Sequence, residues 1–287
     1  MSKTVAYYPG CSLHGTATEL DSSFKATAAA LGLELAEIPG WECCGNTAVH
    51  SAARLLAAAL PANEITKVKV DMKLDTVVVP CAACFSRFMV GLHELDQPEM
   101  KADIARVIGR PPQSDVTVRN LVDVYYHEIG LETLKAKVKR PFQGLKVAAY
   151  YGCLLTRPPK MTLADDPEYP THMEAVLKTL GCAPIDWGDK TDCCGASLAL
   201  CEQSVVIDLT HGILKNAVAC GAEAVVCACP LCQVNLDTRQ KSVKARDPSW
   251  QPVPILYLSQ IVGRAIGVEP ATLGLKKHMV DVTAVMA

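Results

Sequence analysis

A pattern of five cysteines occurs twice in this chain, and it constrains the fold more than any other feature. Each copy has one cysteine, then a Cys-Cys-Gly triplet, then a Cys-x-x-Cys pair. The first copy contains Cys11, Cys43, Cys44, Cys81 and Cys84, and the second contains Cys153, Cys193, Cys194, Cys229 and Cys232. Five thiols exceed the four ligands of a structural zinc site, and adjacent cysteines are awkward disulfide partners. Soft thiolates gathered from separate segments favour iron–sulfur clusters, one for each copy.

The repeat extends beyond the cysteines. Residues 6–11 (AYYPGC) return as residues 149–153 (AYYGC), and matched cysteines lie 142 to 150 positions apart. A duplication is therefore predicted, with a first domain over residues 1–145 and a second domain over residues 146–287. Because four prolines punctuate residues 97–145, this stretch is interpreted as an insertion and linker at the end of the first domain.

Both halves are expected to contain the same elements in the same order. The expected elements are a short strand (5–8; 146–151), a helix (20–31; 172–180), a second strand (34–38; 183–187) and a Val-rich strand that leads into Cys-x-x-Cys and another helix. This alternation predicts an α/β fold with two pseudo-symmetric Rossmann-like halves and mostly parallel strands. The cysteines would then lie at strand C-termini and helix N-termini, where ligands gather in such sheets.

Composition narrows the class of protein. Half of the 287 residues are hydrophobic, a fifth are charged, and the formal net charge is −2. These values fit a globular protein with no general attraction for nucleic acid. No transmembrane segment is expected, because no apolar run reaches about eighteen residues, and the N-terminus lacks the apolar core of a signal peptide. We therefore expect a cytoplasmic protein, in a reducing compartment where such cysteines bind metal more often than they form disulfides.

Taken together, these motifs resemble the paired cysteine-rich (CCG) domains of the B-type subunits of heterodisulfide reductases. The resemblance spans nearly the whole chain, although the gap of 34 residues between Cys194 and Cys229 is one short of the usual range. It implies that each five-cysteine set holds one noncubane [4Fe-4S] cluster. It also implies a catalytic subunit, an oxidoreductase acting on sulfur groups, that reduces or forms a disulfide or related sulfur-linked substrate in two one-electron steps.

The resemblance further implies partners. This chain has no ferredoxin-like cysteine run, so electrons would arrive from a separate iron–sulfur C-type subunit and, behind it, a flavin-containing A-type subunit. Two alternative functions are considered: a non-catalytic iron–sulfur electron-transfer subunit of a larger oxidoreductase, and a zinc-binding scaffold. Complete sets of five cysteines in both halves favour catalysis over simple electron transfer.

Two other residues are candidates for a catalytic role. His14 follows Cys11 by three residues and is a candidate proton donor. Arg157 follows Cys153 by four residues and is a candidate binding group for an anionic substrate, with an ordinary exposed arginine as the alternative. The four cysteines outside the two sets are interpreted as buried structural residues: Cys182, Cys201, Cys220 and Cys227.

Overall fold

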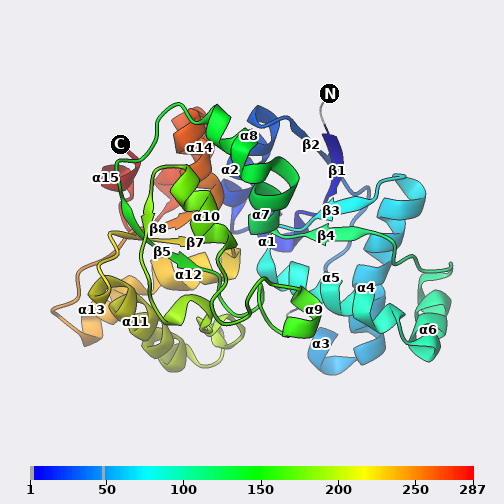
Figure 1. The fold of residues 1–287 in the computed structure, drawn as a ribbon. Helices are drawn as coiled ribbons and strands as arrows, with labels where there is room; N and C mark the ends of the chain where they lie inside the picture. Colours follow the sequence, from blue (N-terminus) through cyan, green and yellow to red (C-terminus); the bar gives the residue numbers. More distant parts are fainter. Residues whose placement is uncertain (1–2, 47–48) are drawn as a thin grey trace.

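Two sheets of four parallel strands form the centre of the computed structural model, which describes residues 3–46 and 49–287 (Figure 1). The strand order is β2-β1-β3-β4 in the first sheet and β6-β5-β7-β8 in the second. The strands are β1 (Lys3–Tyr7), β2 (Leu33–Glu37), β3 (Thr76–Val78), β4 (Thr117–Arg119), β5 (Lys146–Tyr150), β6 (Ala183–Pro184), β7 (Ala224–Cys227) and β8 (Ile255–Tyr257). The predicted α/β fold with two pseudo-symmetric halves is therefore confirmed.

Helices connect the strands and cover the sheets. The α-helices are α1 (Gly10–His14), α2 (Thr18–Ala30), α3 (Val49–Ala52), α4 (Arg54–Thr66), α5 (Ala82–Leu95), α6 (Pro98–Ile108), α7 (Leu121–Asp123), α8 (Leu131–Lys137), α9 (Pro159–Thr162), α10 (His172–Thr179), α11 (Gln203–Ala219), α12 (Pro230–Thr238), α13 (Gln240–Arg246), α14 (Leu258–Ile266) and α15 (Thr283–Met286). Two π-helical segments are η1 (Lys67–Asp71) and η2 (Val124–Gly130). Short 3-10 turns are η3 (Asp189–Thr191), η4 (Ala196–Leu198), η5 (Pro270–Leu273) and η6 (Leu275–Lys277).

The register of the central strands is the same in both sheets. Ala6 pairs with Val77 in the first sheet, and the equivalent residues Ala148 and Val225 pair in the second. These residues are fully buried, as expected for parallel strands that are covered on both faces. The duplicated sequence thus builds duplicated sheets, and the strand ends that carry the cysteines occupy equivalent places.

The two halves exchange helices across their junction. In the second half, α14 follows β8 and packs on α2 of the first half; in the first half, η2 and α8 follow β4 and pack on α10 of the second half. Figure 1 shows α7, α8 and α10 together between the two sheets. The side-chain oxygens of Ser23 in α2 and Ser259 in α14 lie 2.7 Å apart in the buried contact. One continuous hydrophobic core therefore spans both halves.

This exchange changes the interpretation of residues 97–145. The stretch supplies the fourth strand of the first sheet and the helices that cover the second half, so it is more than an insertion and linker. Its counterpart is the β8–α14 segment of the second half. The helical segment α7–η2 of this stretch begins at Asn120, whose side chain caps it by accepting from the backbone N–H groups of Val122 and Asp123.

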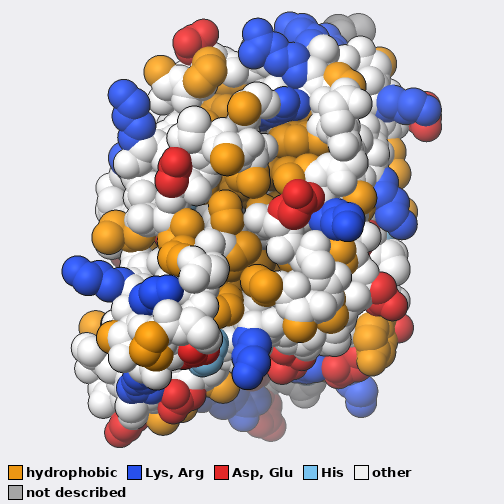
Figure 2. Space-filling model, turned by 90° about the vertical axis from the view of Figure 1, so that its left-hand side faces the viewer, with side chains coloured by type: hydrophobic (Ala, Val, Ile, Leu, Met, Phe, Trp, Pro, Cys, Tyr) orange, Lys and Arg blue, Asp and Glu red, His pale blue; other side chains and the backbone are white. Residues whose placement is uncertain are grey.

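Charges are dispersed over the surface. Figure 2 shows the side of the molecule occupied by the second half, where basic and acidic side chains surround a seam of hydrophobic ones. Neither sign of charge dominates this face, in keeping with the small net charge. Within residues 3–46 and 49–287, no helix is long and apolar enough to cross a bilayer.

Candidate functional site

The cysteines lie where parallel strands end and helices begin. Cys81 is the N-cap residue of α5 and Cys229 is the N-cap residue of α12, so each Cys-x-x-Cys begins a helix directly after a central strand. Cys84 and Cys232 occupy the first turns of the same helices. Helix N-termini carry free N–H groups and a partial positive charge, which stabilise thiolates.

In each half, the second cysteine of the Cys-Cys-Gly triplet meets the second cysteine of the Cys-x-x-Cys pair. The Sγ atoms of Cys44 and Cys84 lie 3.3 Å apart, and those of Cys194 and Cys232 lie 3.6 Å apart. All four residues are buried. Two segments that are separated in the sequence are thus brought together in the same way in both halves.

The two cysteine sets also meet each other. The buried thiols of Cys81, from the first half, and Cys229, from the second half, are close enough to shift each other's pKa, upward for Cys81 and downward for Cys229. All fourteen cysteines fall within the described part of the chain, and all are free thiols. Ten thiols from two sets therefore converge on one region, and this donor set suits thiolate-ligated clusters.

Hydrogen bonds favour the thiolate form of one cysteine in each triplet. A hydrogen bond from Cys84, with help from the backbone N–H of Asn46, lowers the pKa of Cys44 to about 7. A hydrogen bond from Cys153, with help from the backbone of Gly195 and Ala196, lowers the pKa of Cys193 to about 6. Because the thiolate binds metal and the thiol does not, these two positions are prepared as ligands.

A buried tyrosine fixes each Cys-Cys-Gly loop. The Tyr8 hydroxyl donates to the carbonyl of Glu42 at 2.7 Å, and the Tyr150 hydroxyl donates to the carbonyl of Asp192 at 2.6 Å. Each accepting residue directly precedes its Cys-Cys-Gly triplet, and each tyrosine lies three residues before the first cysteine of its set. The repeated Tyr-Tyr motif therefore positions the loop that carries two of the five thiols.

A glycine makes room for a cysteine in each half. Gly10 and Gly152 have a φ of 65°, a left-handed conformation that favours glycine. A Cβ atom would lie 3.1 Å from Sγ of Cys84 at Gly10, and 2.9 Å from Sγ of Cys232 at Gly152. These two glycines are needed both for the backbone turn and for the close approach of the buried thiol.

Two residues that influence the cysteines were not foreseen from the sequence. Arg87 and Asn235 occupy equivalent positions, three residues after Cys84 and Cys232. Asn235 donates from Nδ2 to the carbonyl of Cys194 at 3.0 Å, and the positive charge of Arg87 contributes to the lowered pKa of Cys44. Residues three apart share a helix face, so this spacing after each Cys-x-x-Cys was the available signal.

His14 and Arg157 are engaged elsewhere. His14 lies 3.4 Å from the carboxylate of Glu37 and packs edge-on against Trp41. Arg157 donates to the carbonyl of Thr191 and to the carboxylate of Glu168. The structure therefore gives both side chains partners within the chain, and their proposed roles at a substrate stay predictions.

The cysteines outside the two sets do not behave alike. Cys182 and Cys227 are buried, as expected, and burial raises the pKa of Cys182 to about 12. Cys201 and Cys220 are exposed, so the expectation of burial was wrong for these two. Cys220 caps the C-terminal end of α11 and Cys201 lies in the turn before that helix, where the backbone runs along the surface.

Comparison with known proteins identifies the family. A model of the cysteine-rich domain termed CCG matches residues 5–89 and 147–237, one match in each half. The chain belongs to the CCG cysteine-rich domain family. Each match begins in the first strand of its half and ends beyond the Cys-x-x-Cys pair, so it includes all five cysteines of that set.

This CCG protein is similar to two curated proteins over nearly the whole length of each chain. It is 34% identical over 286 residues, 99% of each chain, to the 8-methylmenaquinol:fumarate reductase membrane anchor subunit of Wolinella succinogenes. It is 27% identical over 285 residues, 96% of this chain and 94% of the relative, to the B-type subunit of the ferredoxin:CoB-CoM heterodisulfide reductase of Methanosarcina mazei. The resemblance to the B-type subunits of heterodisulfide reductases is thus confirmed, and both relatives are subunits of larger oxidoreductases.

A solved structure supports the fold alone. A hypothetical protein from Helicobacter pylori superimposes with a TM-score of 0.74 at 13% identity, over 98% of this chain. The CCG protein spans about half the length of that chain, 53%. Together, the family and its relatives point to iron–sulfur clusters and electron transfer in a multi-subunit oxidoreductase.

Proposed function

We propose that this CCG protein is an iron–sulfur electron-transfer subunit that connects a larger oxidoreductase with a quinol. The observation that carries the proposal is the convergence of both five-cysteine sets at the junction of the halves, where the thiols of Cys81 and Cys229 meet. One set would hold each cluster: Cys11, Cys43, Cys44, Cys81 and Cys84 for the first, and Cys153, Cys193, Cys194, Cys229 and Cys232 for the second. A bound cluster takes up and releases electrons one at a time.

The residues of the chain prepare this site in three ways. Lowered pKa values keep Cys44 and Cys193 ready as thiolate ligands. Arg87 and the N-termini of α5 and α12 offset the negative charge of a thiolate-ligated cluster. Burial of most ligands excludes water from the junction, so that electrons would pass between neighbouring sets rather than to solvent.

The Wolinella relative supports the quinol as the redox partner. Its name assigns it to a complex that oxidises 8-methylmenaquinol and reduces fumarate, and its identity of 34% covers both chains almost completely.

Disulfide reduction is the second candidate. The convergence of the two sets is equally compatible with it, because two clusters that face one S–S bond could each deliver one electron to it. In this case the clusters would be of the noncubane type, and the chain would be the catalytic subunit of a heterodisulfide-reductase-like complex in the cytoplasm. It would receive electrons from an iron–sulfur C-type subunit and a flavin-containing A-type subunit.

One experiment separates these functions. Iron and acid-labile sulfide are measured in the anaerobically purified protein, and EPR spectra are recorded after addition of a hydroquinone or of a thiol. Two clusters predict about eight iron atoms per chain, reduction by the hydroquinone and no response to thiols. A thiol-dependent paramagnetic signal would support disulfide chemistry instead, whereas zinc without iron would exclude both functions.

A further inference from the structure

A cavity lies where the two halves exchange helices. It has a volume of about 290 Å³. Its apolar wall comes from α5 of the first half, through Phe85, Met89 and Leu92, and its opposite side includes Leu155 and Pro170 of the second half. A space of this size, at the lower end of the range of about 300–1,000 Å³ for ligand pockets, fits the ring system of a small organic molecule.

Three of the titratable side chains that line this cavity, beside Arg119 and Asp165, lie close together. The ligand-type atoms of Asp123, His127 and His172 all lie within 4.8 Å of one another. His172 is held in place by stacking on Tyr126, with ring centroids 3.8 Å apart. His127 follows β4 in the first half, whereas His172 begins α10 in the second half, so the exchange of helices brings them together.

The cavity adjoins both cysteine sets. Phe85 in its wall directly follows Cys84, and Leu155 is the second residue after Cys153. Consecutive Cα atoms are about 3.8 Å apart, so the wall begins about 4 Å along the chain from one set and no more than about 8 Å from the other. A redox-active ring in this cavity would therefore lie close to both sets.

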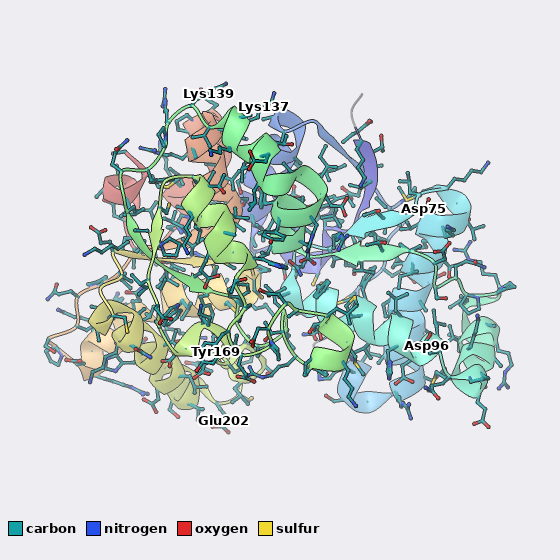
Figure 3. All side chains as sticks on the ribbon, viewed as in Figure 1. Asp75, Asp96, Lys137, Lys139, Tyr169 and Glu202 are labelled. Atoms are coloured by element: carbon teal, nitrogen blue, oxygen red, sulfur yellow. The ribbon has the colours of Figure 1, made fainter. Side chains whose placement is uncertain are left out.

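Two exposed side chains, one aliphatic and one aromatic, lie on the segment that lines the cavity between α9 and α10. Leu163 lines the cavity and is 76% exposed, and Tyr169, which is 61% exposed, precedes Pro170 of the lining. Figure 3 shows Tyr169 on the lower side of the molecule, on the segment that leads into α10. Exposed leucine and tyrosine side chains together suit contact with a lipid chain, with the tyrosine hydroxyl at the water boundary.

We propose that this cavity binds the head group of a lipophilic quinone, with His127 and His172 as its hydrogen-bonding partners and the lipid chain leaving past Leu163. The inference rests on the proposed function and names the site at which the quinol would bind. A cavity that combines an apolar wall with hydrogen-bonding side chains matches a planar ring that carries oxygen atoms. A metal ion at the same three residues is the competing occupant. It is less favoured because Asp123 Oδ2 already accepts from the backbone N–H and side-chain amide of Asn120.

Oxidation of a hydroquinone ring requires proton acceptors, and this requirement explains the two histidines in the cavity. Oxidation of a hydroquinone breaks two O–H bonds and releases two protons and two electrons. In the proposed function, clusters held by the two cysteine sets would supply the capacity to accept two electrons, and the imidazoles of His127 and His172 would accept the two protons. Partial desolvation lowers the pKa of His127, an exposed residue of the lining, and this favours the neutral imidazole, which can accept a proton.

The inference is tested by ligand binding to the full-length, cluster-loaded protein. The probe is 2,3-dimethyl-1,4-naphthoquinone, since both reactive ring carbons carry methyl groups and do not add protein thiols. Anaerobic equilibrium dialysis should show one saturable site. His127→Leu and His172→Leu should each weaken binding about tenfold, as expected for loss of one hydrogen bond. His93→Leu, which changes an exposed histidine near the end of α5, should leave binding unchanged.

A blocking variant keeps the test independent of the histidines. Ala164 lines the cavity from an irregular segment, so Ala164→Trp should fill the mouth and abolish binding with an unchanged iron content. Absent binding to fully loaded protein, or equal binding by all variants, would overturn the inference while leaving the proposed function intact. Stoichiometric zinc that disappears in His172→Leu would assign the three residues to a metal instead. Loss of iron in the unchanged protein would contradict the proposed function itself.

Discussion

At the scale of single residues, the most specific requirement is space beside a buried thiol. Gly152 combines a φ of 65° with a Cβ position only 2.9 Å from Sγ of Cys232. Gly221 has a φ of 92°, but its Cβ position has no neighbour within 4 Å. The two glycines therefore share a left-handed backbone conformation and differ in contact with a proposed cluster ligand.

We predict that Gly152→Ala and Gly221→Ala both lower the free energy of unfolding, by about 1–2 kcal/mol, because alanine is strained in the left-handed region. Only Gly152→Ala should also displace Cys232 and lower the iron content of the protein, by up to one cluster per chain. Iron analysis of both variants after anaerobic purification is the measurement. Equal iron in the two variants would show that the close approach at Gly152 does not matter for the second cluster.

The cysteine sets could be predicted from the sequence because spacing alone defines them, whereas most of their surroundings could not. Arg87 and Asn235 lie one helical turn after a predicted ligand, so local geometry would have been enough to find them. His127 and His172 carry no such signal. They meet only because helices pack across the junction, and nothing in either local sequence specifies the partner helix.

At the scale of elements, the exchange of helices depends on close packing between α2 and α14. Gly263 is buried in α14, and a Cβ there would overlap the side chain of Leu273 and lie 3.2 Å from Thr27 of α2. The succession of the first three strands along each half could be predicted from the repeat, because each of these strands has its own hydrophobic run. The exchange of helices could not be predicted, because residues 97–145 and 252–266 share no obvious motif. Their equivalence appears only from the places of β4 and β8 in the two sheets.

We predict that Gly263→Ala lowers the free energy of unfolding by about 1 kcal/mol, because overpacking of a buried contact outweighs the gain in helix propensity. Gly212 is the matched control, an exposed glycine inside α11 with no neighbour within 4 Å of its Cβ position. Gly212→Ala should instead raise stability by about 0.5–1 kcal/mol. Denaturant unfolding of both variants measures the difference, and a stabilised Gly263→Ala would mean that the junction is loosely packed.

At the scale of the whole molecule, the halves should behave as one cooperative unit despite their separate sheets. A single hydrophobic core includes Val5 and Tyr7 of β1 as well as Val225 and Val226 of β7. Each half also covers its neighbour with helices, so neither sheet keeps its cover when the other half unfolds. When two strands unfold together in one cooperative step, their backbone amides exchange hydrogen with the same free energy of opening.

Native-state hydrogen exchange on the cluster-loaded chain tests this expectation. Backbone amides of β1 and β7 should exchange with equal free energies of opening, although the strands belong to different halves and different sheets. In Gly263→Ala both sets of amides should exchange faster by the same factor, roughly fivefold for 1 kcal/mol. If only one strand lost protection, the halves would be separate folding units, and the shared junction that places both cysteine sets together would have to be stabilised by the clusters rather than by the exchanged helices.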